Sequence, residues 1–444
     1  MIMTKLRRIS APSWGIGLAV ALAAAAIIVP AAAGWKVYVD FSPLHAVWAP
    51  RLGFGTVPSV VIGVLAVWFG GRLAAGLRWR SLLLVAFGAG LAWMISLATV
   101  DGLNGIQTVL DLKTEYLRTA RAVTDPSATL HDYIARIPLS SAHHWPVHIA
   151  GHPPGALLFF VGLVHLGLGS GLAAGLVVIV LAATTPVAVL MTLRRLGAET
   201  QARQAAPFLV IGTAAIWMAV SADAMFGAVA AWGLCCLAVA ATSRRLGAVA
   251  GWGAAAGLLL GYCVMLSYGL VLLGVLAIAV LLAARSWRVL PWAVVSASAI
   301  VLGFAVAGFA WWQAYPLLDQ RYWDGIASMR PFGYWIWGDL AALIFSAGPI
   351  LGASIASAAT HARAVRDRTG GVRVVTVLVI AAATSVLLAD LSGMSKAEVE
   401  RIWLPFVPWL LLGTALLPER WRHWGLTVQV AAALFIQHLL ATTW

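Results

Sequence analysis

Residues 171–195 read GLAAGLVVIVLAATTPVAVLMTLRR, an apolar run that ends on Arg194 and Arg195. A helix needs roughly 20 apolar residues to cross the hydrocarbon core of a bilayer. Short cytoplasmic loops collect Lys and Arg, so the arginine pair marks the cytoplasmic end of this run. The stretch therefore predicts a membrane-spanning helix and fixes its direction.

Apolar runs of similar length recur along the whole chain. They cover residues at about 13–33, 57–77, 81–99, 153–169, 171–192, 205–221, 224–242, 247–266, 269–284, 289–310, 336–358, 374–392, 402–418 and 424–441. Two full spans between Pro153 and Leu193 would place Arg194 on the outer side of the membrane, against the rule that puts basic residues on the cytoplasmic side. We therefore expect that stretch to cross once, with one piece a half-helix or a surface helix. The pattern predicts an all-α polytopic membrane protein with about 13 transmembrane helices.

The composition excludes several classes of protein. Of the 444 residues, 62% are hydrophobic and 10% are charged, whereas soluble chains carry about 25% charged residues. A soluble enzyme, a disulfide scaffold and a disordered protein are therefore excluded. The net charge of +13 forms no basic stripe on a soluble face, so we expect no nucleic-acid partner. Cys235, Cys236 and Cys263 lie in apolar runs and are interpreted as packing residues.

The basic residues between the apolar runs orient the chain in the membrane. They are Arg78 and Arg80, Arg194 and Arg195, Arg244 and Arg245, Arg285 and Arg288, the run Arg363, Arg366, Arg368 and Arg373, and Arg420 and Arg422. With these residues inside and the C-terminus outside, 19 bases and three acids are cytoplasmic, against ten bases and 13 acids outside. Acids contribute little to the orientation rule, so this asymmetry indicates that chemistry or binding takes place on the outer face.

The predicted outer loop 101–152 is the richest segment in polar residues. It opens on Asp101 and Asn104, directly after an apolar run, where a carboxylate is expensive unless it is hydrated or used. Two interfacial helices are expected, one over about 108–123 and a short one after Asp125-Pro126-Ser127, and their alternative role is to shield the loop backbone from lipid.

The loop ends in a histidine-rich segment. His143, His144, His148 and His152 invite a metal site, but their spacing fits no zinc pattern, and a polar lining is the alternative. Pro153 and Pro154 follow and predict a helix start at the membrane surface, whose free amides favour an anion such as a phosphate.

Three further outer segments supply polar groups. Asp223 falls between two apolar runs and lies in a cleft or caps a helix. Tyr322 and Asp324 belong to the aromatic loop 311–338, a candidate sugar-binding surface or an aromatic belt at the interface. The segment 393–402 holds Lys396, Glu398 and Arg401. Its cations are candidates for binding a phosphate or for pairing with neighbouring acids.

These residues resemble the GT-C class of membrane glycosyltransferases, which use polyprenyl-phosphate-linked sugars. The resemblance rests on an acid in the first large outer loop, two interfacial helices, a His-Pro-Pro helix start and a later acid at an outer helix end. Here those are Asp101, the 108–137 region, His152-Pro153-Pro154-Gly155 and Asp223. The composition, rich in Gly, Ala and Arg, is similar to that of actinobacterial proteins. Two departures from the family pattern are evident. Two apolar runs, 13–33 and 57–77, precede the run that leads to Asp101, so the catalytic module would begin at the third span; and Asp101 is a single acid, where many relatives show a pair.

The resemblance implies three regions. They are two N-terminal transmembrane helices in 1–80, a GT-C-like catalytic module in 81–245 that contains the outer loop 101–152, and C-terminal transmembrane helices in 246–444 with the outer loops 311–338 and 393–402.

The resemblance also implies an inverting sugar transfer on the outer face of the plasma membrane. Its partners are a polyprenyl-phosphate-linked sugar donor, a cell-envelope glycan or glycolipid acceptor and the lipid bilayer. Asp101 would be the general base, with a substrate-binding role for the remaining residues, namely Asn104, His148, His152, Asp223, Tyr322, Asp324, Lys396, Glu398 and Arg401. The resemblance implies no particular cofactor, and a divalent cation coordinated by Asp223 is the alternative.

Two other classes of function remain open. A transporter or lipid flippase would have buried charges at the midplane and paired broken helices, and neither is evident in the sequence. A non-catalytic subunit of an envelope-synthesis complex with a degenerate GT-C fold would look similar to the enzyme. Transfer of sugar by membranes that contain the chain would separate the enzyme from both.

Overall fold

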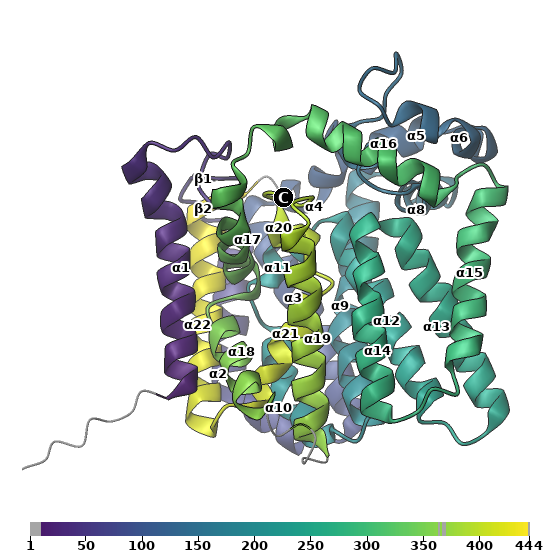
Figure 1. The fold of residues 1–444 in the computed structure, drawn as a ribbon. Coiled ribbons are helices and arrows are strands. Elements are labelled where there is room, and N and C mark those ends of the chain that lie inside the picture. The colour runs from purple at the N-terminus through teal and green to yellow at the C-terminus, as the bar shows by residue number, and fades with distance from the viewer. Residues whose placement is uncertain (1–9, 363–364, 366–369, 443–444) are drawn as a thin grey trace, which may run out of the picture.

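The computed structural model describes residues 10–362, 365 and 370–442, which form an upright bundle of helices (Figure 1). In order, the helices of the first half are α1 (Ala11–Ala33), α2 (Thr56–Gly76), α3 (Trp79–Ala98), α4 (Asn104–Gln107), α5 (Tyr116–Ala122), α6 (Pro126–Asp132), α7 (Val147–Ala150), α8 (Pro154–His165), α9 (Gly171–Arg195), α10 (Glu199–Val210), α11 (Ala214–Met218) and α12 (Ala222–Ala241). The second half adds α13 (Leu246–Leu266), α14 (Leu273–Ala284), α15 (Leu290–Val306), α16 (Trp311–Asp324), α17 (Phe332–Ala347), α18 (Ile350–Ala362), α19 (Gly371–Leu391), α20 (Val399–Ile402), α21 (Val407–Leu411) and α22 (Glu419–Leu439). The basic residues Arg363, Arg366 and Arg368 used above lie outside the described residues.

Short 3₁₀ turns and one small ribbon complete the fold. The turns are η1 (Thr99–Asp101), η2 (Val109–Asp111), η3 (Ile134–Arg136), η4 (Tyr268–Leu272), η5 (Ile326–Ser328) and η6 (Leu412–Leu416). The strands β1 (Ala46–Trp48) and β2 (Leu440–Thr442) pair antiparallel, with Val47 opposite Ala441. This ribbon, which ties the first loop to the last described residues, is absent from the all-α prediction.

The helices are those of a membrane-spanning protein. Among the described residues, seven are long and apolar enough to cross a bilayer, and nine if each of two bent pairs is a single span. The seven are α1, α2, α3 with its 3₁₀ extension, α9, α12, α13 and α19; the bent pairs are α15 with α16 and α17 with α18. The prediction of an α-helical membrane protein is therefore confirmed in outline, whereas the count of about 13 spans is not.

Several predicted spans are interrupted by proline or glycine. The run 205–221 divides into α10 and α11 around Gly212, and the run 336–358 bends by 104° between α17 and α18, where Gly348 has a φ of +84°. Freed backbone groups at these breaks find partners: Trp93 Nε1 donates to the Gly212 carbonyl (3.0 Å), and Gln429 Nε2 donates to the Ala347 carbonyl (2.8 Å). Broken helices at membrane depth are stable only with such replacements.

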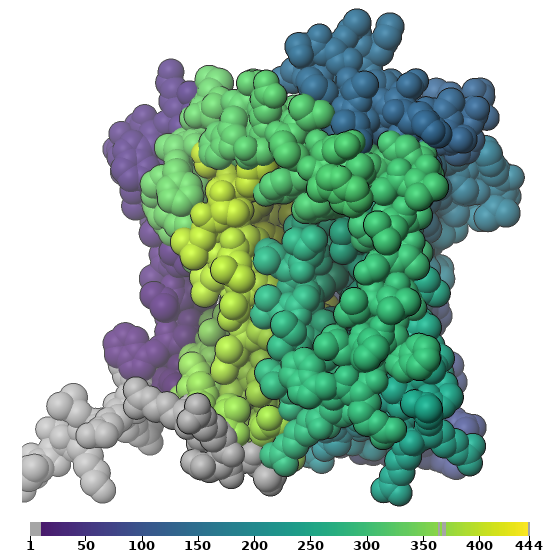
Figure 2. All heavy atoms as spheres, turned by 45° about the vertical axis from the view of Figure 1, so that its right-hand side comes forward, coloured from purple at the N-terminus to yellow at the C-terminus, as the bar shows by residue number. Residues whose placement is uncertain are grey.

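The bundle has two chemically different ends. At one end, Arg203 of α10 donates to the carbonyl of Leu77 between α2 and α3 (2.9 Å), and Arg373 of α19 donates to the carbonyl of Leu282 in α14 (3.2 Å). We call this the arginine end. The predicted outer loops 101–152, 311–338 and 393–402 lie together at the opposite end, called the loop end (Figure 1). Figure 2 shows the 101–152 segment, in blue, as a raised lobe there.

The stretch 153–192 contains one membrane-crossing helix. α8 has only 12 residues, and both of its ends lie at the loop end. The carbonyl of Gly169, just after α8, accepts from Arg121 of the loop (2.9 Å), and Gly171 at the start of α9 packs on the backbone of Gln107. α9 alone then runs to the arginine end. The expected half-helix is therefore α8.

Small residues allow close approach of helices inside the bundle. Gly253, Gly257 and Gly261 recur every four residues on α13 and face α15, where a Cβ on Gly257 or Gly261 would collide with the backbone of Ala293 or Ala297. Without a hydrophobic driving force between helices in lipid, such contacts supply the van der Waals energy of association.

Candidate functional site

The loop end holds a buried cluster of five ionisable side chains from four distant segments. Arg401 of α20 donates to Asp223 of α12 (2.6 Å) and to Glu398 (2.7 Å), which precedes α20. Its Nη2 also lies 3.0 Å from Nε2 of His148 in α7. Nδ1 of His148 lies 2.6 Å from Oε1 of Glu115, the residue before α5. We call these five residues the ionic cluster.

Most of the ionic cluster is buried, so its charges interact strongly with one another. Asp223 and Arg401 are 2% and 3% exposed, and Glu115 and His148 are also buried, whereas the Glu398 side chain is 25% exposed. Burial and Arg401 lower the pKa of His148, but the carboxylates of Glu115 and Glu398 outweigh both and raise that pKa to about 9. With His148 protonated, three carboxylates face two cations, so the cluster as it stands favours neutral hydrogen-bond donors over an added anion.

Opposite charges keep Glu398 and Arg401 ionised. Burial acts to raise the pKa of Glu398, but His148 and Arg401 hold it well below its usual range. Burial acts to lower the pKa of Arg401, but Asp223 and Glu398 raise it further. Both groups therefore remain charged at any physiological pH.

Two hydroxyl groups beside the cluster have no hydrogen-bond partner among the residues that the structure describes. They are Oη of Tyr116, which follows Glu115, and Oγ of Ser221, two residues before Asp223; both are buried. Burial raises the pKa of Tyr116 well above its usual value, and the charges of Glu115 and Asp223 add to this effect. Buried polar groups in native proteins almost always have a partner, so these hydroxyls are free to bond to a water molecule or a polar ligand.

His152 lies at the edge of the ionic cluster. Its ring packs against Tyr116 (centroids 6.1 Å apart) and Phe226 (5.6 Å), and Nδ1 lies 2.7 Å from the carbonyl of His148. Burial lowers the pKa of His152 despite the nearby Asp223, which favours the neutral ring. The next residue, Pro153, is the N-cap of α8, as the Pro-Pro pair predicts.

Asp101 stands apart from the ionic cluster. Its carboxylate forms an ion pair with Arg51 and accepts from Gln437 of α22 (3.1 Å), and its side chain is 35% exposed. Asn104 is exposed and bonds to Gln107 over 2.9 Å. The predicted site residues are thus divided: four of them, namely His148, Asp223, Glu398 and Arg401, meet in the cluster, and His152 adjoins it. No hydrogen bond or ion pair among the described residues joins Asp101 to them.

Lys396 and Tyr322 hold a turn of the backbone. The Lys396 ammonium is buried, donates to the carbonyls of Ala327 (3.1 Å) and Arg330 (3.0 Å), and lies 4.5 Å from the ring centroid of Trp323. Its backbone N–H donates to the Tyr322 hydroxyl (2.9 Å). Lys396 is therefore occupied by backbone acceptors, while Asp324 is exposed at the end of α16.

The turn that follows Lys396 is strained. Ala397 and Glu398 both have left-handed backbones, with φ of 67° and 63°, which cost non-glycine residues roughly 1–3 kcal/mol each. Asp339 accepts from the Ala397 N–H over 2.9 Å and secures the conformation. The turn brings Glu398 against His148 and Arg401.

Glu115 points into the ionic cluster because the helix expected over 108–123 is interrupted just before it. The expected helix over 108–123 is interrupted: η2 ends at Asp111, and α5 begins only at Tyr116. The later start moves Glu115 to the N-cap, where it points inward to His148 instead of outward to water. The second expected helix is confirmed as α6, capped by Asp125, whose side chain accepts from Ser127 N (2.8 Å).

The described residues contain no group of three His, Cys, Asp or Glu side chains arranged to hold a metal ion. Oδ2 of Asp223 is taken by Arg401. The geometry therefore lends no support to a cation-binding role for Asp223.

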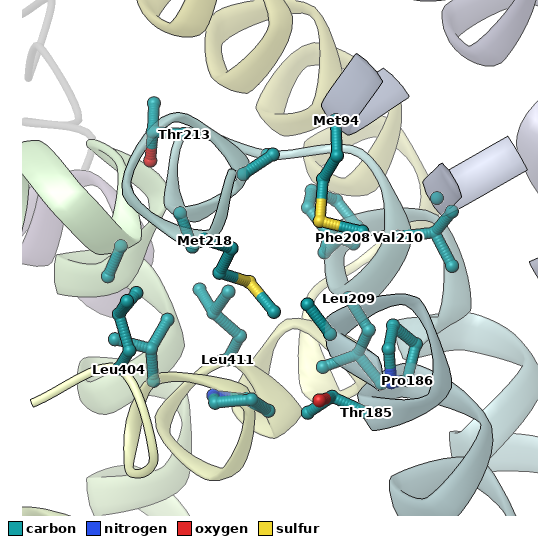
Figure 3. A pocket seen from close by; sticks show the side chains of 18 of the residues that line it. Met94, Thr185, Pro186, Phe208, Leu209, Val210, Thr213, Met218, Leu404 and Leu411 are labelled. Atoms are coloured by element: carbon teal, nitrogen blue, oxygen red, sulfur yellow. The ribbon is translucent and has the colours of Figure 1, made fainter. Parts of the chain in front are cut away.

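Some residues that line an apolar hollow lie close in sequence to residues of the ionic cluster. The hollow encloses free space of about 30 Å³, room for one or two water molecules, and Met94 and Met218 point into it (Figure 3). Met218 leads within five residues to Asp223, and Leu404, also in its lining, follows Arg401 by three. The thioether side chains of Met94 and Met218 are flexible and adapt readily to irregular shapes.

No protein-family model matches this chain, and no curated protein matches it. Fold and site define an α-helical protein of the membrane-spanning type with a buried ionic cluster at its loop end.

Proposed function

We propose that the protein is an integral membrane glycosyltransferase that moves a sugar from a polyprenyl-phosphate donor to a cell-envelope glycan or glycolipid. The supporting observation is the ionic cluster, with its two unpartnered hydroxyls, next in the chain to an apolar hollow. A lipid-linked sugar has the same two parts, a polyhydroxylated head that donates hydrogen bonds and a hydrocarbon tail. The ionic cluster has more carboxylates than cations, and carboxylates accept hydrogen bonds from the hydroxyl groups of a sugar head.

The proposed transfer takes place at the loop end, on the outer face of the plasma membrane. The acceptor hydroxyl oxygen attacks the anomeric carbon from the face opposite the phosphate, and the carbon–oxygen bond to the phosphate breaks. The hydroxyl proton passes to Asp101. Asp101 suits this role better than Asp223 or Glu115, because its carboxylate is partly exposed whereas theirs are buried.

The leaving lipid phosphate needs positive charge nearby. The start of α8 beside His152 offers the positive end of the helix dipole, and Arg401 becomes available if Glu398, on its strained turn, moves away. Lys396 has no such role in this proposal, because its ammonium is occupied.

The proposal includes about 13 passages through the membrane. They are α1, α2, α3, α9, α10 with α11, α12, α13, α14, α15, α17 with α18, α19, α21 with η6, and α22. This count is supported by the alternating direction of successive elements between the two ends of the bundle (Figure 1).

The decisive experiment compares two carboxylates of the same loop. Three membrane preparations are compared, which contain the parent protein, the variant Asp101→Asn or the variant Asp111→Asn. Each is incubated with radiolabelled polyprenyl-phosphate sugars, and the amount of labelled product is measured. Asp111 is the matched control, because it too is partly exposed and paired, with Arg121 at 2.8 Å. Loss of a general base lowers the rate by about 10²–10⁴, so Asp101→Asn should lose that activity while Asp111→Asn keeps it. Equal transfer by all three proteins would refute the assignment of Asp101.

A lipid transporter is the second candidate, favoured by the broken helices around the apolar hollow. The breaks at Gly212 and after Ala347 both contribute to its lining, together with Pro186 inside α9. Discontinuous helices around a central cavity are typical of transporters. The lining carries no charged residue, which favours a lipid chain over an ion as cargo. Movement of a fluorescent polyprenyl phosphate across vesicles, without sugar transfer, would select this candidate.

A further inference from the structure

Two open hollows adjoin each other at the arginine end, far from the proposed chemistry. The first, of about 590 Å³, is lined by Arg78, Trp79, Arg80, Ser81 and Arg194. The second, of about 530 Å³, is lined by Met191, Arg194, Arg195 and Thr242. Arg194 belongs to both and therefore forms the ridge between them.

The ridge is held rigidly in place. Nε of Arg194 lies 2.9 Å from Oε2 of Glu199, and its guanidinium lies 4.6 Å from the ring centroid of Trp79. Arg203 takes the other oxygen of Glu199 (2.8 Å) and is anchored to the α2–α3 turn. Glu199 is thus shared by two cations and neutralises only part of their charge.

The remaining cations of the two hollows are available to a ligand. Arg78, Arg80 and Arg195 are exposed, and none of their guanidinium groups makes a hydrogen bond or ion pair with another described residue. Four arginines thus line the hollows. Glu199 is the only carboxylate within the described part of the chain that pairs with them, and it is already shared with Arg203. Guanidinium groups bind phosphate oxygens by paired, charge-assisted hydrogen bonds. At least two arginines line each hollow, so each hollow can bind one phosphate group.

The hollows border a lipid-facing surface. Leu84, one turn beyond Arg80 on α3, is 72% exposed, and Val85 beside it is also exposed. Leu73 on α2 is exposed as well. In a membrane, these side chains lie against acyl chains, so a molecule in the hollows has charged groups on one side and hydrocarbon on the other.

We infer that the two hollows bind an anionic phospholipid whose headgroup carries two phosphates, of the diphosphatidylglycerol type. One phosphate lies on each side of Arg194, and the acyl chains run along α3. Basic pockets between transmembrane helices are suited to such headgroups. A soluble anion would use the arginines but not the apolar border, and for this reason we assign the site to a lipid.

The test measures lipid binding to the full-length protein in detergent by native mass spectrometry. The probes are cardiolipin, phosphatidylglycerol with its single phosphate, phosphatidylethanolamine and inorganic pyrophosphate. The parent should retain cardiolipin in preference to all three others. The variant Arg78→Gln/Arg80→Gln/Arg195→Gln should bind cardiolipin more weakly, by roughly fivefold for each arginine lost, the contribution of one basic residue at an anionic surface.

The matched control is Arg285→Gln/Arg288→Gln/Arg420→Gln, which removes the same charge from exposed arginines outside both hollows. It should bind cardiolipin like the parent. The single variant Arg80→Gln, at an exposed position, tests the site without risk to folding, and the thermal midpoint of each lipid-free variant reports its integrity. Equal losses in the two triple variants, equal retention of phosphatidylglycerol, or binding of pyrophosphate in place of lipid would each overturn the inference.

Discussion

Arg401 and Asp223 lie 178 residues apart in the chain, yet the Arg401 guanidinium donates to the Asp223 carboxylate over 2.6 Å where both side chains are almost fully buried. The pair joins α12 to the segment before α21. Through His148 and Glu398, it also joins both to the outer loop. A buried ion pair gains little stability over an apolar one, but removal of one partner leaves an uncompensated charge. The pair therefore ties together segments that neither local propensity nor apolar packing would align.

Removal of Arg401 should destabilise the protein strongly. Arg401→Met leaves the buried Asp223 without its cation and removes one of the two cations beside Glu398, and should cost about 3–5 kcal/mol in the free energy of unfolding. The control Arg121→Met breaks the exposed pair with Asp111 and should cost about 0–1 kcal/mol. Denaturant titration in detergent measures both. Adding Asp223→Asn to Arg401→Met should recover part of the loss; no recovery would contradict the assigned coupling.

The stability of the protein should fall as the solution becomes alkaline. The pKa of His148 is raised to about 9 by Glu115 and Glu398, above an unfolded value of about 6.5. Protonated His148 therefore contributes its full stabilisation below pH 6.5. That contribution, at most about 3 kcal/mol, is lost as the pH rises through 9.

His148→Gln is the variant that tests this effect. It should flatten the stability profile between pH 6.5 and 9, whereas His143→Gln, in the same loop but exposed, should leave it intact. Thermal midpoints measured across this range decide the matter. A parent protein whose stability is constant over the range would show that His148 is neutral in the fold.

Relief of the strained turn before α20 should stabilise the protein. Glycine adopts the left-handed backbone of Ala397 without steric cost, so Ala397→Gly should gain up to about 1 kcal/mol after the entropy of the unfolded chain is subtracted. Ala188→Gly, inside α9 and equally buried, is the control and should lose at least that amount. Denaturant midpoints compare the two. A loss of stability in both variants would show that the turn is not strained.

The outline of the fold is readable from the sequence because bilayer physics acts locally. About 20 apolar residues ending in arginines, as in α9, have a single stable placement. The charge of Arg194 predicts one crossing in 153–192, and of the two helices there only α9 is long and apolar enough to cross a bilayer. The prediction from apolar runs failed where proline or glycine interrupts a run, as at Gly348, because the partner that makes the break tolerable, Gln429, lies 81 residues away.

The ionic cluster was only partly visible in the sequence. His148, Asp223 and Arg401 stand out because a polar group beside apolar runs is expensive without a use. Glu115 does not stand out, because its role depends on α5 starting at Tyr116, and helix boundaries are the least reliable feature of a pattern. The pairing of Asp101 with Gln437 joins residues 336 positions apart, and no spacing rule predicts such a contact.

Close packing between α13 and α15 should depend on the glycines of their interface. Gly257→Leu places a side chain against the backbone of Ala293 and should force the helices apart, at a cost of several kcal/mol, since van der Waals contact is the main attraction between helices in lipid. Gly251→Leu is the matched control on the same helix, because nothing lies within 4 Å of its Cβ position. It should match the parent or gain slightly from better helix propensity. Yield of folded protein in detergent and its thermal midpoint measure both variants; equal behaviour of the two would show that α13 and α15 are not in contact through this face.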